Sequence, residues 1–546
     1  MSTRRPNFLF FIADQLRADH LGCYGHPTIR TPNIDALAAR GARFDRCYVA
    51  SAVCQPNRIT LMTGRMPSLH GTQQNGIPLA LDAVCFTHLL RAGGWRTALF
   101  GKAHFQNFTG APSRFQLEWP AGQRQPPPEL REPTRGLRTG PGYDREYAFD
   151  ASTDPNADER QGDFYGFERF RVCTWHADSV RGHYSAWLRE RLPQADSLRG
   201  AVPPPHDPSL VAPQVRASAL PEHLYPTRYV ADQTIAYLEE RARDPAGEPF
   251  FVQCSFPDPH HPFTPPGRFA SMYDPADVTL PESFHRRPHD PPPMLARLHE
   301  ELALGTRHLQ DWVAPYAVTE AEARHTLAAT WGMVSLIDDA VGRVMRRLEA
   351  LGLAANTVVV FTSDHGDWMG DHGVMLKGPM HYQGLIRTPL IWTEPQSGPT
   401  PAGAASATAG LAVSAVASSL DIARSLLARA GLAAGHGMQG QDLGACLRTP
   451  DRSEHDCVIV EHQTSRPAPG ATRRLRVRTM TDGRWRLSIW DGVPFAELYD
   501  LDADPHELVN RWNDPGSRGR RAELVERMLR KTIDLQERAP FPVGEA

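Results

Sequence analysis

The sequence predicts an α/β protein: a largely parallel β-sheet with helices on both faces, followed by a smaller C-terminal domain with an antiparallel sheet. Short apolar segments rich in β-branched and aromatic residues recur in the first part of the chain, as in strands buried on both faces. Helical segments separate them, which is typical of parallel sheets. Near the C-terminus the apolar segments follow one another without a long helix between them, which indicates antiparallel strands.

Four segments have the composition of strands that are buried on both faces of a sheet. These predicted strands comprise residues 7–13, 95–100, 249–256 and 356–363. Amphipathic patterns between them predict helices at residues 31–41 and 319–352. Thr31 is placed to cap the first of these helices and Gly41 to end it.

A further helix is predicted within VASAVCQPNRITLMTGR, residues 49–65, beginning near Cys54 and ending at Gly64. Pro56 has a fixed φ and no N–H, so it suits a first helical turn. The helix N-terminus and the charge of Arg58 both favour an anionic group at residue 54. The alternative is that Cys54 is a small buried residue in a packing turn.

The composition is that of a large globular chain, with 546 residues, 41% hydrophobic and 22% charged. A formal net charge of −3 gives no electrostatic reason to expect nucleic acid or a membrane as partner. The N-terminal run FLFFIA meets Asp14 at once, so we expect a strand and not a signal peptide. Eight scattered cysteines without paired spacing suit the reducing cytoplasm.

Lysine is rare in this chain, because only Lys102, Lys377 and Lys531 occur among 59 basic residues. A lysine retained against this bias is a candidate for chemistry that arginine cannot perform. Its ammonium is a compact charge that can release a proton, whereas a guanidinium is planar and stays protonated.

Polar residues follow each of the four predicted strands. They are Asp14 and Gln15, Lys102 and His104, His260, and Asp364 and His365. Because ligands of open α/β sheets bind at the carboxyl ends of the strands, we expect these side chains to converge. Asp14, Asp364 and His365, with Gln15, offer oxygen and nitrogen ligands for a divalent cation. A cation beside the basic groups of this set, with Arg58 and Lys377, suits an ester of a tetrahedral oxyanion.

Several motifs resemble those of the sulfatase family and occur in the family's order. CQPNRITLMTGR (54–65) is similar to the sulfatase signature, Cys-x-Pro-x-Arg followed by Thr-Gly-Arg. Later blocks of the family are resembled by GKAH (101–104), PHHPF (259–263), SDHGDWMGDHGVMLKG (363–378) and ELYDLDADPHELVNRWNDP (497–515). The resemblance implies an alkaline-phosphatase-like α/β core with a smaller C-terminal domain built on an antiparallel sheet.

The resemblance also implies a modified residue and a metal ion. Cys54 would be oxidised to Cα-formylglycine (3-oxoalanine) by a formylglycine-generating enzyme that reads Pro56 and Arg58. Asn57 stands where the family often has Ser or Ala, a departure that we expect to be tolerated. The implied metal ligands are Asp14, Gln15, Asp364, His365 and the modified Cys54.

The two pairs of implied metal ligands, Asp14-Gln15 and Asp364-His365, resemble those of choline sulfatases, iduronate sulfatases and phosphonate monoester hydrolases. Many sulfatases instead have Asp-Asp and Asp-Asn with calcium. An imidazole ligand moves the preference toward a softer ion, so calcium, manganese and zinc all remain candidates.

The implied reaction is hydrolysis of an aryl or alkyl sulfate monoester through a covalent formylglycine-sulfate intermediate. A hydroxyl of the hydrated aldehyde attacks sulfur, and His260 and Lys377 assist the departing alcohol. His104 accepts the proton of the second hydroxyl, which expels sulfate. Lys102 and Arg58 hold charge on the sulfate and on the formylglycine oxygens.

The alternative is a phosphonate monoester or phosphodiester hydrolase of the same superfamily. Such enzymes resemble this chain in QQNGIPL (73–79), which implies that Asn75 binds substrate together with Lys102, His260 and Lys377. They have neutral hydroxyl residues in place of the GKAH block, so Lys102 and His104 favour the sulfatase. A catalytically inactive binding protein of the same fold would lack a motif residue, and none is missing.

We expect a catalytic domain at residues 1–435. Residues 436–546 are expected to form a C-terminal domain that contains antiparallel strands and a helix. Segments 106–225 and 264–315 are rich in Pro, Arg, His and Gly and predict long loops over the rim of the site. The expected partners are a small sulfate ester and the maturing enzyme, and a homo-oligomer remains open.

Overall fold

The computed structural model describes residues 5–110, 121–124, 127, 136–151, 163–200, 207–395, 408–468 and 471–536. Within these residues, a nine-stranded mixed sheet forms the centre of the larger part of the molecule. Its strands, in spatial order, are β11 (Leu411–Ser418), β2 (Ala42–Tyr48), β10 (Leu390–Thr393), β8 (Thr357–Ser363), β1 (Asn7–Ala13), β6 (Phe250–Ser255), β3 (Arg96–Lys102), β4 (Arg169–Thr174) and β5 (Arg181–Gly182). The four predicted strands are β1, β3, β6 and β8, which are therefore confirmed.

The sheet is largely parallel, as predicted. β1 pairs in parallel with β6 and β8, β3 pairs in parallel with β6 and β4, and β11 pairs in parallel with β2. β10 is antiparallel to β2 and β8, and β5 is antiparallel to β4. The run β8-β1-β6-β3-β4 is thus all parallel, so the carboxyl ends of these five neighbouring strands lie along one edge.

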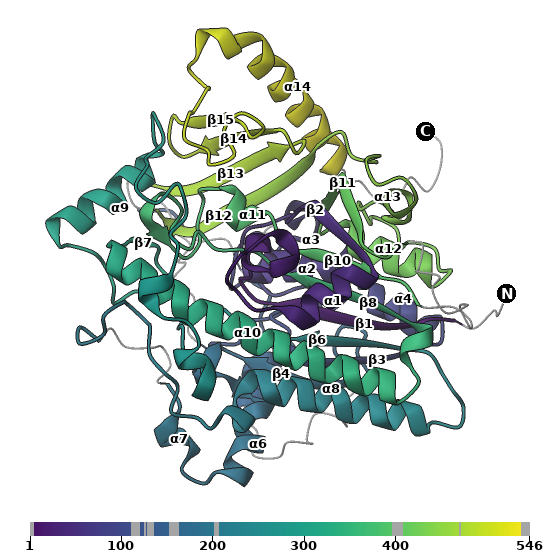
Figure 1. Ribbon diagram of the computed structural model, residues 1–546. Helices are drawn as coiled ribbons and strands as arrows, with labels where there is room; N and C mark the ends of the chain where they lie inside the picture. The colour runs from purple at the N-terminus through teal and green to yellow at the C-terminus, as the bar shows by residue number, and fades with distance from the viewer. Residues whose placement is uncertain are drawn as a thin grey trace, which may run out of the picture.

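Helices cover both faces of the sheet. Alternate residues of each strand face opposite sides, so each strand contributes to two cores. Leu9 and Phe11 of β1 lie in one core with α1 (Pro32–Arg40), α8 (Pro226–Arg243) and α10 (Glu320–Ala350). Phe8 and Phe10 lie in the other core with α2 (Cys54–Thr63), α4 (Phe86–Ala92) and α12 (Asp421–Arg429). In Figure 1, α8 and α10 run side by side across the face of the sheet that is turned toward the viewer.

The three predicted helices form close to their predicted bounds, but the N-terminus of α1 is held differently from the expectation. Thr31 makes no capping hydrogen bond to the helix. Instead, Asp338 of α10 accepts the N–H groups of Asn33 at 2.9 Å and Ile34 at 2.8 Å. The cap therefore comes from a residue distant in sequence, which no local pattern could indicate. α2 ends as predicted at Gly64, which has a φ of 63°.

Segment 106–225 differs from the expectation of long loops, since its described part contains two strands of the central sheet. It also contains α5 (Arg145–Ala151), α6 (His183–Arg191) and α7 (Ala195–Leu198), and segment 264–315 contains α9 (Pro293–Leu304). β4 alternates buried Phe170 and Val172 with Arg169 and Arg171. These arginines make the strand look polar in sequence, so it was missed.

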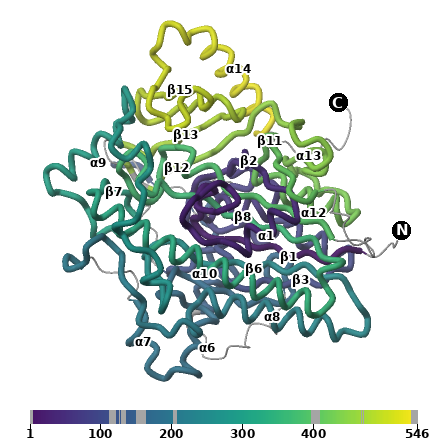
Figure 2. The backbone as a smooth tube through the Cα atoms, in the orientation of Figure 1, coloured from purple at the N-terminus to yellow at the C-terminus, as the bar shows by residue number. Residues whose placement is uncertain are grey.

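The C-terminal part is the expected antiparallel sheet with a terminal helix. Strands β12 (Val458–Pro467), β13 (Arg474–Thr481), β14 (Trp485–Asp491) and β15 (Ala496–Asp500) pair in chain order, and α14 (Arg518–Leu535) packs against them. Figure 2 shows this part, in yellow-green and yellow, next to the ends of β2 and β11. Val460, Val477 and Trp490 of this sheet share an apolar cluster with Trp368 and Tyr382 of the larger part.

Two further findings concern membranes and disulfides. Among the described residues, no helix combines the length and the apolar character needed to cross a membrane. All eight cysteines are unpaired. Cys446, which follows the expected domain boundary, lies in α13 (Gly444–Arg448) and packs into the core of the larger part.

Candidate active site

The predicted site residues meet at the carboxyl edge of the sheet. Asp14 follows β1, Lys102 ends β3, His260 lies in the loop after β6, and Asp364 follows β8. Cys54 begins α2 on the same edge. Each of these five side chains is buried, so the chain holds a concentration of charge away from bulk water, as functional sites do.

The Cys54 thiol lies at the centre of this group. Its Sγ is 3.0 Å from Nε2 of His365, 3.1 Å from Nζ of Lys377 and 3.8 Å from Oδ1 of Asp14. Burial alone would raise the pKa of Cys54, but the charges of Lys102 and Lys377 outweigh it and lower the pKa below its ordinary value. An anionic group is therefore favoured at this position, as the sequence predicted.

Arg58 fixes α2 against the sheet. One helical turn beyond Cys54, its Nε donates to Oδ2 of Asp364 at 2.6 Å, and one terminal nitrogen donates to the carbonyl oxygen of Lys102 at 3.0 Å. The Arg58–Asp364 pair is fully buried. Removing either partner would leave an uncompensated charge in the interior, which is costly.

The donor atoms of Asp14, Cys54, Asp364 and His365 all lie within 4.8 Å of one another. Nδ1 of His365 is 2.7 Å from the carbonyl oxygen of Gly366 and donates to it, so Nε2 keeps the lone pair that faces Cys54. Oδ1 of Asp364 is fixed by the N–H groups of Gln15 and His365. Two carboxylates and an oriented imidazole fit a divalent cation, so these residues suit the implied metal.

Lys377 lies among the same groups. Its Nζ donates to Oε1 of Gln15 at 2.7 Å, to Nε2 of His260 at 2.9 Å and to Sγ of Cys54 at 3.1 Å, and it is 3.2 Å from Nε2 of His365. It is also partly exposed, unlike the buried Lys102. The structure thus brings the predicted leaving-group pair, His260 and Lys377, into direct contact.

His176, which sequence reasoning missed, is a second histidine on this side of the site. It lies two residues beyond β4 and accepts a hydrogen bond from Nζ of Lys102 at 2.7 Å. Its ring stacks on that of His260 with 3.5 Å between centroids. Burial and Lys102 lower the pKa of His176 to about 3. Like the other site residues, His176 is a polar residue that follows a strand of the sheet. The arginines of β4 make that strand look polar in sequence, so the pattern was not recognised.

Glu146 of α5 is another residue that the sequence did not indicate. Its carboxylate accepts the backbone N–H groups of His104 at 3.0 Å, Phe105 at 2.6 Å and Gln106 at 3.0 Å. It is fully buried, and burial raises its pKa to about 7. The loop that presents the His104 ring is therefore fixed by one side chain. That ring packs against Phe108 in a tilted arrangement, with 4.3 Å between centroids and an interplanar angle of 59°.

Asn75 lies next to the site and contacts the start of α2. Its side chain is exposed, and its Oδ1 accepts the N–H of Gln55 at 3.1 Å. Oε1 of Gln55 in turn accepts the N–H of Gly76 at 2.7 Å. Asn75 thus satisfies an orphan donor at the N-terminus of α2, and its substrate contact stays a prediction.

Backbone strain is concentrated next to these residues. Gln15, His104, Trp175 and Leu376 have φ angles of 67°, 58°, 62° and 72°, in the left-handed region that non-glycine residues rarely adopt. Each is a site residue or the immediate neighbour of one. Such strain persists where the surrounding structure over-determines the conformation, and it is common at functional sites.

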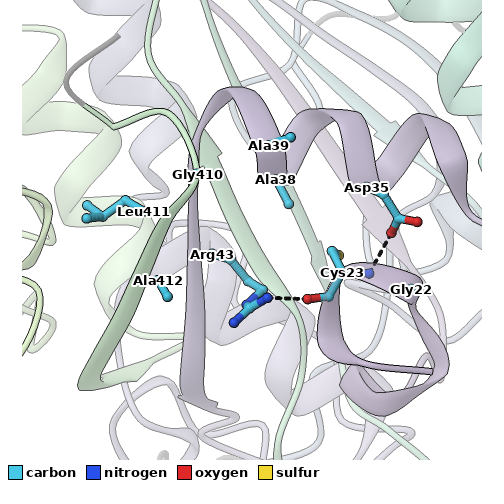
Figure 3. Close-up of a pocket in the computed structure, with 9 residues that line it drawn as sticks. All are labelled: Gly22, Cys23, Asp35, Ala38, Ala39, Arg43, Gly410, Leu411 and Ala412. Atoms are coloured by element: carbon cyan, nitrogen blue, oxygen red, sulfur yellow. Dashed lines mark hydrogen bonds between the residues drawn. The ribbon is translucent and has the colours of Figure 1, made fainter. Parts of the chain in front are cut away.

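A cavity of about 370 Å³ lies elsewhere, near the amino ends of β2 and β11 (Figure 3). Its charged groups are partnered, because Asp35 accepts the N–H of Cys23 and Arg43 donates to Asp45. It lies at the amino end of these strands, opposite to the carboxyl edge where the site residues meet, so it is not part of the site.

The fold and the site together define a hydrolase of oxyanion esters with ligands for a divalent cation. The chain belongs to the sulfatase family: the model of that family, described as "Sulfatase", matches residues 6–432. A second model, "N-sulphoglucosamine sulphohydrolase, C-terminal", matches residues 370–534. The expected alkaline-phosphatase-like fold is confirmed by its solved neighbours.

Three relatives show the extent of the likeness. An ulvan-active sulfatase of Formosa agariphila is 25% identical over 533 residues, covering 97% of this chain and 82% of the relative. A choline-sulfatase of Rhizobium meliloti is 24% identical and covers 94% and 84%. The crystal structure of a phosphonate monoester hydrolase of Agrobacterium radiobacter superposes with a TM-score of 0.73 at 25% identity and covers 97% and 96%.

Proposed function

We propose that this protein hydrolyses sulfate monoesters with Cys54 oxidised to formylglycine. The observation that carries the proposal is the position of the Cys54 side chain. It lies at the N-terminus of α2, within 4.8 Å of three candidate metal ligands and 3.1 Å from Nζ of Lys377. An aldehyde hydrate built on residue 54 would have its two hydroxyls among a cation site, a lysine and histidines.

The ligands that would hold the cation are Asp14, Gln15, Asp364, His365 and residue 54. When bound, the cation would lower the pKa of a hydroxyl on residue 54 and draw charge from the ester. The Nε2 lone pair of His365 favours manganese or zinc over calcium. We propose one such ion per chain.

The chain's own residues divide between the two ends of the ester. Lys377 and His260, which are in contact, assist the departing alcohol oxygen with charge and a proton. Lys102 and Arg58 hold charge on the sulfate oxygens. His104 accepts the proton of the second hydroxyl, and burial keeps it neutral by lowering its pKa well below the usual range.

The phosphonate monoester hydrolase alternative shares the fold and much of the metal site. Lys102 and His104 favour the sulfatase, because both are present and buried at the carboxyl edge of the sheet. Lys102 contacts Asp14, and the charges of Lys102 and Arg58 act on His104, which supports a role for this group in binding the three terminal oxygens of a sulfate ester rather than the two of a phosphonate monoester.

We also propose that the enzyme works in the cytoplasm, after a formylglycine-generating enzyme has modified it. Eight unpaired cysteines support a reducing compartment. Cell fractionation would test the location, and activity only on co-expression with the modifying enzyme would test the partner.

The test of the function is a substrate screen on protein whose residue 54 has been checked by peptide mass. We expect formylglycine at that residue and faster hydrolysis of nitrophenyl sulfate than of a nitrophenyl phosphonate ester. Cys54→Ala should be folded and inactive. Fully active protein with only unmodified cysteine, or a preference for the phosphonate, would overturn the proposal.

A further inference from the structure

We infer that His176 is a positioning residue of this reaction, whose imidazole holds the Lys102 ammonium at the sulfate-binding side of the site. The inference rests on the proposed function, which gives Lys102 its task. It starts from one contact, the hydrogen bond of 2.7 Å from Nζ of Lys102 to Nε2 of His176.

The contact fixes the state of the histidine. An ammonium group has donors and no acceptor, so Nε2 of His176 must carry the lone pair and the proton of the neutral ring must lie on Nδ1. His176 as a residue is 4% exposed. Nδ1 is buried and has no hydrogen-bond partner among the residues that the structure describes. The polar contacts of the ring are made by Nε2 toward the site, with Nζ of Lys102 at 2.7 Å and with Oδ2 of Asp14 at 3.5 Å.

The sheet register brings the two residues to the same end of neighbouring strands. β3 and β4 are parallel neighbours, and Lys102 is paired with Cys173. His176 follows three residues later, where the chain leaves the sheet edge through Trp175, which has a φ of 62°. The turn brings the His176 ring back over the end of β3, so this contact depends on a strand in the segment expected to be a loop.

The same groups could in principle hold a second cation, because donor atoms of Asp14, His176 and His260 lie within 4.8 Å of one another. The Lys102 ammonium already contacts two of these three groups, Asp14 and His176. A metal there would have to displace a buried ammonium. Lys102 therefore supplies the positive charge that a second metal ion provides in two-metal hydrolases.

The contact also joins the two lysines of the site. His176 stacks on His260 at 3.5 Å with an interplanar angle of 9°, and His260 accepts from Lys377 at 2.9 Å. Two parallel imidazoles thus separate Lys102 from Lys377 and keep each ammonium on its own end of the ester. Phe108 closes the Lys102 side, with its ring centroid 5.9 Å from Nζ.

The test compares His176→Leu with His176→Gln, because a glutamine oxygen can replace Nε2 as an acceptor and leucine cannot. We expect His176→Leu to lower kcat/KM for nitrophenyl sulfate and to weaken inhibition by inorganic sulfate, each by ~10–100-fold, the usual range for residues that orient a site. His176→Gln should recover most of both losses. His183→Gln, at a buried histidine that accepts the N–H of Val172, is the matched control and should stay near wild type.

A second readout observes Lys102 directly. The chain has only three lysines, so isotope-labelled lysine gives three side-chain signals in an NMR spectrum, assigned by Lys377→Arg and Lys531→Arg. We expect His176→Leu to shift the Lys102 signal and to leave that of Lys531 on α14 unchanged. An unmoved Lys102 signal, or equal kinetic losses for the leucine and glutamine variants, would overturn the inference.

Measurements of metal content and of formylglycine at residue 54 distinguish a failure of this inference from a failure of the proposed function. We expect one metal ion per chain and unchanged formylglycine content in both His176 variants, and two ions per chain in the wild type would overturn it. If the wild type prefers a phosphonate ester, the proposed function fails. The NMR signal of Lys102 and the inhibition by inorganic sulfate would still test His176.

Discussion

Nζ of Lys377 lies 3.1 Å from Sγ of Cys54. One of the three lysines of this arginine-rich chain is therefore in contact with the side chain that is expected to become the nucleophile. The same nitrogen is 2.9 Å from Nε2 of His260, so it lies between the nucleophile position and the histidine assigned to the leaving group.

The first prediction is that Lys377→Arg does not preserve function although it keeps the charge. A guanidinium is wider, planar and does not lose its proton, and Nζ of Lys377 is in direct contact with Gln15, Cys54 and His260. We expect kcat/KM to fall ~100-fold or more for alkyl sulfates, and less for nitrophenyl sulfate, whose leaving oxygen needs little protonation.

The measurement is kcat/KM across a series of leaving-group pKa values. Lys531→Arg is the matched control, because Lys531 pairs with Asp534 on α14 and should not affect the reaction. Parallel plots for wild type and Lys377→Arg would show that Lys377 binds sulfate without assisting the leaving group.

The second prediction concerns the metal. Asp364→Asn keeps the shape of the side chain but removes its charge, which faces both the cation site and Arg58 at 2.6 Å. We expect metal content and kcat to fall by at least ~10–100-fold. Elemental analysis of the purified protein gives the metal content. Asp338→Asn, which affects the cap of α1, should keep the metal, and a metal-replete Asp364→Asn protein would contradict the ligand assignment.

The third prediction is a pH dependence of stability caused by Glu146. Burial raises its pKa from 4.5 to about 7, so the folded state binds more protons than the unfolded state between these values. Stability therefore falls as the pH rises from about 4.5 to about 7. Glu146→Gln cannot titrate, so the free energy of unfolding of the wild type relative to this variant should drop by about 2–3 kcal/mol across the window.

Chemical denaturation of both proteins at several pH values measures this difference. Glu146→Gln also places an amide donor near the N–H groups of His104, Phe105 and Gln106, which the carboxylate accepts. We therefore expect kcat to fall by about 10-fold, as for other residues that orient a site. A stability difference that is constant with pH would show that the pKa of Glu146 is the same in the folded and the unfolded protein.

The fourth prediction concerns Asn57, the departure from the common signature. Its Nδ2 donates to the carbonyl oxygen of Asp364 at 2.5 Å, and its Oδ1 accepts from the N–H of Ala50 at 3.1 Å and from Oγ of Ser419 at 2.8 Å. Asn57→Ser is too short for all three bonds. We expect the free energy of unfolding to fall by about 1–3 kcal/mol, while peptide mass shows formylglycine as in the wild type.

Asn513→Ser is the control for this variant, because Asn513 is exposed and bonds to Asp290 at the surface. Its effect on stability should be within about 0.5 kcal/mol. Loss of formylglycine in Asn57→Ser with unchanged stability would assign Asn57 to the recognition of Cys54 by the modifying enzyme and not to packing.

Local patterns in the sequence determined most of the catalytic edge. β1, β3, β6 and β8 are buried on both faces, so their apolar runs are continuous and their ends are visible as the polar residues Asp14, Lys102, His260 and Asp364. The parallel arrangement then places these ends together. Cys54 at the start of α2 was visible for the same kind of reason, because Pro56 and Gly64 mark a helix locally.

Only the tertiary structure decided which residues hold the site in place. His176 follows a strand whose arginines Arg169 and Arg171 conceal it, and Glu146 acts on His104 across 42 residues of chain. Asp338 caps α1 from α10, a separation of more than 300 residues. These contacts are hydrogen bonds between segments that are distant in sequence, and no periodicity or local composition indicates them. Their partners are set by the packing of the whole sheet and its helices, which is why the sequence alone determined the chemistry of this site but not its support.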